Sequence, residues 1–230
     1  MIPLRDSVRS STRPYVTWIL IALNIYIFYR QFMLPVDMLN QVYLHFGVVP
    51  ADLSYALASG TSLVPVLLTF ITAMFLHGGW VHVLGNMLYL WVFGDNVEDR
   101  LGHLRYLLFY LASGVAGGIA HFLSNPASQV PIIGASGAIA GILGAYLIAF
   151  PRSRVLTLLP IFIFFTIVEI PAVIFLAIWF VLQLFNGAAS IGGTANTVAW
   201  WAHVGGFVAG AIMIKLLPAR RRDNYYYSRE

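Results

Sequence analysis

Hydrophobic residues form long runs separated by short polar breaks, and the runs do not alternate strictly between apolar and polar positions. A helix needs about 20 apolar residues to cross the roughly 30 Å hydrocarbon core of a bilayer. Because lipid cannot satisfy bare backbone groups, non-alternating runs predict helices rather than a barrel. The expected fold is therefore an all-α membrane protein, a six-transmembrane-helix bundle. Its spans are expected at Tyr15 to Met33, Val81 to Gly94, Leu104 to Leu123, Ile133 to Phe150, Ile170 to Phe185 and Trp200 to Leu217.

The apolar run from Val155 to Phe185 is too long for one crossing, because as a single helix it would extend about 47 Å. We expect Pro160 and Pro171 to divide it. Glu169 then lies near the cytoplasmic mouth of the fifth span, as an interfacial carboxylate rather than a proton relay.

The connection between the first and second spans is a long outer loop, Leu34 to Trp80, without a basic residue. Its apolar stretch from Leu63 to Leu76 is interrupted by Pro65 and lies close to the second span. We expect this stretch to lie in the outer interface of the membrane rather than to cross it.

The composition requires lipid as a solvent: 60% of the residues are hydrophobic, 10% are charged and the mean hydropathy is +0.81. The net charge of +4 does not indicate a nucleic-acid partner, because the basic residues lie at the ends of the predicted spans. The chain has no cysteine, which excludes thiol catalysis, disulfides and thiolate metal sites.

The basic residues also predict the orientation. All Lys and Arg residues except Arg30 fall on one side of the six-span arrangement, and that side is expected to be cytoplasmic. The predicted organisation is a cytoplasmic N-terminal segment (1–14), a six-span membrane domain (15–217) and a basic cytoplasmic tail (218–230). The expected location is the cell (inner) membrane of a prokaryote, with both termini cytoplasmic.

Polar side chains occur at similar depth in three of the predicted spans, about one helical turn below the outer ends. The second span carries His82 and Asn86, the fourth Ser136 and the sixth His203. His82 and Asn86 are four residues apart and therefore share one helix face. Taken singly, such a serine usually bonds its own helix backbone, and such a histidine usually pairs with a neighbouring helix.

Glycines surround two of these residues. Ser136 lies in the sequence Gly134-Ala135-Ser136-Gly137 at the start of its helix, where a backbone amide can donate to an oxyanion. Glycines also follow His203 at Gly206 and Gly210. Close helix packing explains these glycines, and a Ser–His contact of about 3 Å requires the same packing.

Acyl transfer is the chemistry that such a pair supports. His203 would take the Ser136 proton, the hydroxyl would attack a peptide carbonyl, and the imidazolium would protonate the leaving amine. His82, Asn86 and the Ser136 backbone amide are the expected oxyanion donors. The nearest acidic residues to the second span lie at its cytoplasmic end, so we expect a dyad.

These motifs together resemble the rhomboid family of intramembrane serine proteases over nearly the whole chain. Gly134 to Gly137 is similar to the family's GxSG motif, and Ala202 to Gly210 is similar to its AHxxGxxxG helix. The segment from His77 to Asn86 resembles the one that supplies oxyanion donors. Glu98-Asp99-Arg100 resembles an ExR motif, in which Glu98 and Arg100 would be structural links.

The resemblance implies a rhomboid-like bundle that hydrolyses single-span membrane proteins near the outer face, with no cofactor, metal or nucleic acid. Ala140 stands where some members place a tyrosine against the catalytic histidine. Trp179 and Phe180 are candidates for shaping substrate entry beside a lateral gate, although packing is the more common role of such aromatics.

Three other classes remain open. An inactive rhomboid-like protein would bind membrane helices without cutting them. A transporter would use His82, His203 and Glu169 as a proton path, yet the sequence has no evident inverted repeat. A zinc protease would use His77, His82 and His203, yet the sequence has no His-Glu-x-x-His helix.

Overall fold

The computed structural model describes residues 1–161, 164–190 and 198–220. The basic tail predicted at 218–230 therefore lies largely outside the described residues. The helices are α1 (Tyr15–Phe32), α2 (Val36–Phe46), α3 (Pro50–Ser59), α4 (Val64–Thr72), α5 (Trp80–Leu101), α6 (His103–Ser124), α7 (Ser136–Ala149), α8 (Ala172–Ala189) and α9 (Trp200–Leu216), with a 3₁₀ turn, η1 (Ala73–Phe75). The strands are β1 (Ile2–Asp6), β2 (Arg154–Ile161) and β3 (Phe164–Pro171).

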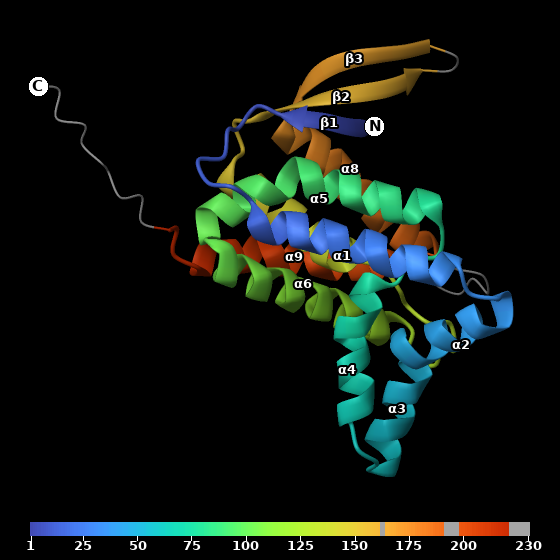
Figure 1. Cartoon of the computed structure of the whole chain (residues 1–230). Helices are drawn as coiled ribbons and strands as arrows, with labels where there is room; N and C mark the ends of the chain where they lie inside the picture. The colour runs from blue at the N-terminus through green and yellow to red at the C-terminus, as the bar shows by residue number, and fades with distance from the viewer. Residues whose placement is uncertain (162–163, 191–197, 221–230) are drawn as a thin grey trace, which may run out of the picture.

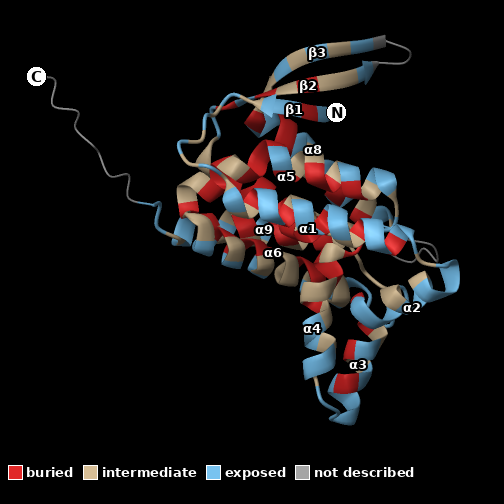
Figure 2. Ribbon diagram, in the orientation of Figure 1, coloured by how far each residue is buried: buried red, intermediate tan, exposed pale blue. Residues whose placement is uncertain are grey.

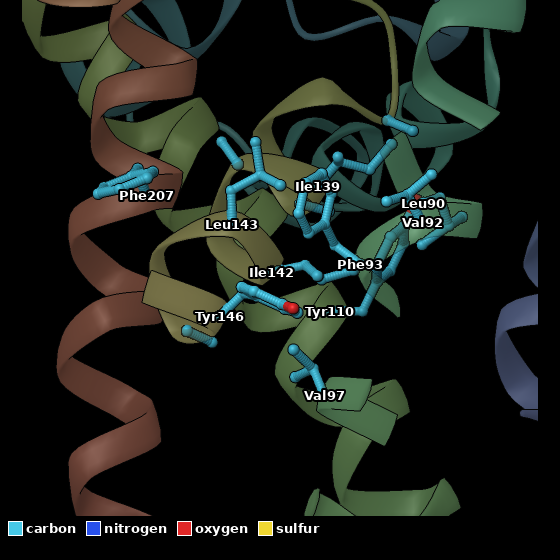
Figure 3. Packing of buried hydrophobic residues seen from close by; sticks show 14 of the residues in the cluster. Leu90, Val92, Phe93, Val97, Tyr110, Ile139, Ile142, Leu143, Tyr146 and Phe207 are labelled. Carbon is cyan, nitrogen blue, oxygen red and sulfur yellow. The ribbon is translucent and has the colours of Figure 1, made fainter. Parts of the chain in front are cut away.

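Helix α7 forms the centre of the bundle. All its residues from Gly137 to Tyr146 are buried, and it packs chiefly against α9, α6 and α5. Figure 2 shows buried residues, in red, along the helices of the bundle around it. Figure 3 shows Ile139, Ile142 and Leu143 of α7 among the side chains of the neighbouring helices. Because α7 is apolar on every side, it has to be enclosed by other helices.

A helix lies at each of the six positions where the sequence predicts a span. By length and hydropathy, the described part of the chain holds two helices that could cross a membrane singly, α6 and α8. The pair Val64–Phe75 and Trp80–Leu101, bent by 84°, gives a third if it is one broken span. Helices α7 and α9 are apolar but shorter. The count of six crossings therefore stays a prediction.

The segment predicted as an outer loop is largely helical. It contains α2, α3, α4 and η1, and α3 and α4 project side by side from the bundle (Figure 1). Val48 forms an isolated antiparallel bridge with Ile132, just before the Ser136 motif. This bridge connects the outer segment to the chain that leads into α7.

The all-α prediction is wrong for the chain between α7 and α8, which forms the β2–β3 hairpin. Pro160 does not divide two helices; it lies in β2 opposite Phe165. β-branched and aromatic side chains dominate this run, and such side chains favour extended backbone. Pro171 does precede a helix, because it is the N-cap residue of α8.

The N-terminal segment adds a third strand. β1 pairs antiparallel with β2, so that Ile2 lies opposite Leu158 (Figure 1). Glu169 is exposed on β3 and lies 3.8 Å from Arg154. It therefore belongs to the sheet and not to a helix, which removes it from the alternative proton path.

Asp6 attaches this sheet to the bundle. Its carboxylate accepts hydrogen bonds from the Tyr146 hydroxyl on α7 and from Asn96 on α5, the latter at 2.9 Å. Burial is the main cause that raises the pKa of Asp6 to about 6, with a contribution from the nearby Asp95 carboxyl.

Candidate active site

Ser136 and His203 meet where α7 and α9 cross. Ser136 is the first residue of α7, and its Oγ lies 2.8 Å from Nε2 of His203, in the first turn of α9. This is the hydrogen-bond distance that a nucleophile and its general base require. The structure therefore brings together the two residues that the sequence predicts as a pair.

Glycines allow this contact because they bring two backbones together. A Cβ placed on Gly206 would lie 2.0 Å from the carbonyl oxygen of Gly137, and one on Gly210 would lie 2.0 Å from that of Gly141. From the opposite helix, a Cβ on Gly144 would lie 2.0 Å from the carbonyl oxygen of Phe207. The α7–α9 contact thus has no room for a methyl group at these positions, as helix pairs packed through small residues require.

Gly134 gives the chain before Ser136 its special shape. Its φ of +118° strains any L side chain, and an added Cβ would lie 2.6 Å from Nε2 of His82. Its amide donates to the carbonyl of Ala73 at 2.8 Å. Backbone shape and the closeness of His82 both require glycine here.

His82 is oriented by its own loop. The amide of Gly78 donates to Nδ1 of His82 at 3.3 Å, so Nε2 carries the hydrogen in the neutral ring. That nitrogen lies 2.6 Å from the position that a Cβ of Gly134 would take, two residues before Ser136. A donor there can reach an oxyanion that forms at Ser136.

Asn86 lies one turn further along α5, with its Nδ2 3.0 Å from Nε2 of His77. The His77 backbone is fixed in turn by Gln31, at 3.2 and 3.3 Å, and by the Tyr43 hydroxyl, at 2.9 Å. His77 is fully buried, and its ring contacts both predicted oxyanion donors, His82 and Asn86. In the described residues no hydrogen bond joins His82 or Asn86 to Ser136.

A cavity of about 760 Å³ opens beside the pair. Ser136, His203, His82 and Asn86 all line it, together with His121 of α6. A cavity of this size and with these polar walls can hold water and a stretch of extended peptide. The four predicted site residues therefore face one common space.

Helix α8 holds the other side of the His203 ring, a feature that the sequence analysis missed. Oε1 of Gln183 lies 2.8 Å from Nδ1 of His203. The rings of Trp179 and Trp200 each lie 6.0 Å from the imidazole. Gln183 is the one polar residue among the buried residues of α8, and that isolated polar position was the available signal.

Trp179 and Phe180 face the bundle rather than lipid. Both rings stack on Phe207 of α9, at 5.9 and 4.4 Å. Their packing role is therefore shown, and a role in substrate entry stays a prediction.

Glu98 and Arg100 lie at the other end of α5, about 24 and 27 Å from His82 at 1.5 Å per residue. Glu98 is fully buried and accepts hydrogen bonds from the backbone amides of Val16 and Thr17, so it caps the N-terminus of α1. Its Oε1 also lies 2.6 Å from Nδ1 of His103.

Arg100 has a different environment. Its carbonyl accepts a hydrogen bond from the Arg220 amide at 2.7 Å, and its buried Nε has no hydrogen-bond partner in the described part of the chain. Within the described residues, the Arg100 side chain therefore forms no hydrogen bond comparable to those by which Glu98 holds the N-terminus of α1.

The ligand set for zinc is not assembled. Within the described ranges, no three His, Asp or Glu side chains are close enough to share a metal ion. His77 is turned toward Asn86, and His203 toward Ser136 and Gln183.

Comparison with known proteins gives the family. A model of the Rhomboid domain matches residues 65–220. Rhomboid protease GluP of Bacillus subtilis is 37% identical over 149 residues, which cover 65% of this chain and 28% of that protein. RHOMBOID-like protein 1 of Arabidopsis thaliana is 34% identical over 158 residues, which cover 69% of this chain and 36% of that protein. The mitochondrial Rhomboid protein 1 of Saccharomyces cerevisiae is 29% identical over 149 residues, which cover 63% of this chain and 40% of that protein.

The match to the Rhomboid domain and the helical bundle place the chain in a class of integral membrane proteins. Within that class, the chain belongs to the rhomboid family. The family typically consists of serine proteases that act on transmembrane substrates in the bilayer, and some members are inactive. The chain spans well under half the length of each of the three relatives.

Proposed function

We propose that this chain is an intramembrane serine endopeptidase that cuts single-span membrane proteins near the outer membrane face. The observation that carries the proposal is the 2.8 Å contact between Ser136 Oγ and His203 Nε2 beside an open cavity. The name of the relative from Bacillus subtilis, a rhomboid protease, supports it.

The reaction would begin with proton transfer from Ser136 Oγ to Nε2 of His203 while Oγ attacks the peptide carbonyl. Nε2 of His203 then returns the proton to the leaving amine, which leaves an acyl ester on Ser136. Water from the cavity attacks the ester, again with His203 as base, and releases the second product.

Hydrogen-bond donors would approach the oxyanion from two directions. The Ser136 amide lies at the start of α7, where the helix dipole favours negative charge. Nε2–H of His82 approaches from α5, and Asn86 lines the same wall. Each donor of this kind contributes about 10²–10³ in rate.

The proposed location is the cell membrane of a prokaryote, with the site near the outer face and both termini cytoplasmic. The predicted arrangement of Lys and Arg residues supports this orientation. A reporter that is active only outside the cytoplasm, fused after Arg220, should be silent. The same reporter inserted at Gly60, in the α3–α4 turn, should be active.

The test of activity uses purified protein in liposomes with a fluorescent single-span reporter. We expect cutting that resists EDTA and falls by about 10⁴-fold or more in Ser136→Ala and in His203→Ala. A fluorophosphonate probe should label wild type and leave Ser136→Ala unlabelled. Cutting that survives Ser136→Ala would refute the nucleophile assignment.

The alternative is a rhomboid-like protein that binds membrane helices without cutting them. Absence of both cutting and probe labelling in wild type, across a varied reporter panel, would favour that alternative. Loss of cutting in EDTA would point instead to a metal-dependent activity.

A further inference from the structure

The polar partner of His203 on α8 has no place in a two-residue mechanism. Gln183 is 7% exposed, and the other buried residues of α8 are apolar or glycine. Burying a carboxamide is unfavourable unless both its ends form hydrogen bonds. Both ends of Gln183 are satisfied, and one of the two partners is the proposed catalytic base.

The orientation of the carboxamide follows from its two neighbours. Nε2 of Gln183 donates to the carbonyl oxygen of Trp179 at 3.1 Å, and Oε1 faces Nδ1 of His203 at 2.8 Å. The opposite orientation would set Oε1 against the Trp179 carbonyl, so that two acceptors would face each other. The oxygen end therefore faces the imidazole.

A carboxamide oxygen only accepts hydrogen bonds, so Nδ1 of His203 must carry the hydrogen. In a neutral imidazole the other nitrogen, Nε2, then has a free lone pair. This is the nitrogen that lies 2.8 Å from Ser136 Oγ. A hydrogen-bonded sequence thus runs from Trp179 through Gln183 and His203 to Ser136.

We propose that Gln183 is a positioning residue that selects the reactive tautomer of His203 and aligns its ring with Ser136. The inference rests on the proposed function and adds a neutral third member to the predicted dyad. A carboxamide does this without placing a second charge beside the base, and an uncharged group suits an apolar helix. When His203 becomes protonated, the same oxygen still accepts from Nδ1–H.

The first experiment measures the tautomer and does not depend on activity. Protein labelled with ¹⁵N-histidine is observed by NMR, and Ser136→Ala and His203→Ala serve to assign the His203 signals. We expect wild type to hold its hydrogen on Nδ1, and Gln183→Met to give a mixture of tautomers. A wild-type ring with its hydrogen on Nε2, or an unchanged ring in Gln183→Met, would overturn the proposal.

The second experiment measures catalysis at several pH values. Gln183→Met should lower kcat by about tenfold to a hundredfold with little change in KM. This loss is part of the 10²–10⁴-fold rate increase that a positioned general base supplies. Gln183→Glu keeps an acceptor against Nδ1 but sets its second oxygen against the Trp179 carbonyl, so it should recover only part of the rate lost in Gln183→Met. It should also move the acid limb of the profile to higher pH, because a carboxylate favours imidazolium. Leu184→Met, a neighbouring change of similar size, should match wild type.

The two proposals fail in distinguishable ways. Wild type that neither cuts nor reacts with the fluorophosphonate would refute the protease, while the NMR result would still decide the role of Gln183. Active wild type with an equally active Gln183→Met, or with Gln183→Glu as impaired as Gln183→Met, would refute the role of Gln183 and leave the protease standing.

Discussion

Two helices approach His203 from opposite sides, and they do so by different means. Helix α7 meets α9 backbone to backbone, since Gly206 and Gly210 lie directly against opposing carbonyl groups. Helix α8 meets α9 through side chains, with Trp179 and Phe180 stacked on Phe207. The α7–α9 contact sets the distance between Ser136 and His203, the proposed nucleophile and base, and the α8–α9 contact sets how the His203 ring is turned.

The two contacts also differ in exposure. Almost the whole of α7 is buried, whereas α8 exposes large apolar side chains such as Val181, Leu182 and Phe185. A backbone contact without spare volume tolerates no adjustment, while stacked rings can adapt. Substitutions on the two sides should therefore have effects of different size and kind.

The largest effect is expected from Gly206→Val, which would force α7 and α9 apart. Inserting carbon atoms into a filled interface costs about 1–3 kcal/mol or more, and here the obstacle is backbone. We expect a lower unfolding temperature in detergent and no measurable reporter cleavage. Gly85→Ala is the control, because an added Cβ there meets no atom within 4 Å. Wild-type stability and cleavage in Gly206→Val would show that the close contact is not required.

Next in size is the loss of an oxyanion donor on α5, which separates stabilisation of the transition state from both α9 contacts. Asn86→Ala should lower kcat by about 10²-fold and leave KM nearly unchanged, while loss of the hydrogen bond to the buried His77 should lower the unfolding temperature. Asn125→Ala alters another amide of the cavity wall and should retain kcat. Equal losses of kcat in the two variants would indicate a general effect on the cavity.

A smaller effect is expected on the α8 side. Trp179→Leu removes a ring that lies 6.0 Å from the imidazole, and such aromatic contacts contribute about 0.5–1.5 kcal/mol, or up to roughly tenfold in kcat. Steady-state kinetics would measure this loss, with Ile178→Leu on the exposed face of α8 as the matched variant. A loss as large as that of Gly206→Val would contradict the distinction between the two contacts.

The smallest effect should come from Asp6, which contacts α7 at the end opposite Ser136. Because its pKa is raised to about 6 in the folded protein, the folded state binds this proton more tightly than the unfolded state. The Asp6 contribution to stability should therefore decrease as pH rises from about 4 to about 6. Asp6→Asn should remove it.

Hydrogen exchange of β1 amides at pH 4.5 and 7 would measure the Asp6 contribution as the difference between wild type and variant. Identical pH dependence in both proteins would contradict it. Cleavage at pH 7 should differ little between them, because α7 remains held by α9.

Local motifs made the contact between Ser136 and His203 predictable. Gly134, Ser136, His203 and Gly206 lie in short motifs that are weak singly, and the equal depth of Ser136 and His203 in the predicted spans suggested their meeting. Gln183 gave no such pattern, since its function depends on which face of α8 turns toward α9. Helix phase of that kind is decided by packing, and since both Gln183 and Asn186 are polar in this run, the sequence alone does not show which of them turns inward.

The sheet was not predictable for a related reason. The run from Val155 to Ile170 is predominantly apolar, with Glu169 near its end, so in a membrane protein it looks like another helix. Its partner, β1, lies about 150 residues earlier in the sequence, and pairing over such a distance leaves no local signal. The contact of Asp6 with Tyr146 depends on that pairing and was missed with it.

The glycine contact also limits how a lineage of such proteins can diverge. Gly144, Gly206 and Gly210 each face a carbonyl that cannot retreat alone, so a single substitution has no neighbouring change to compensate for it. The α7–α9 pair should therefore be inherited as a unit. Mutations would accumulate instead on the exposed faces of α8 and on the projecting α3 and α4, so that the outer surface would change across the lineage while the Ser136–His203 contact stays the same.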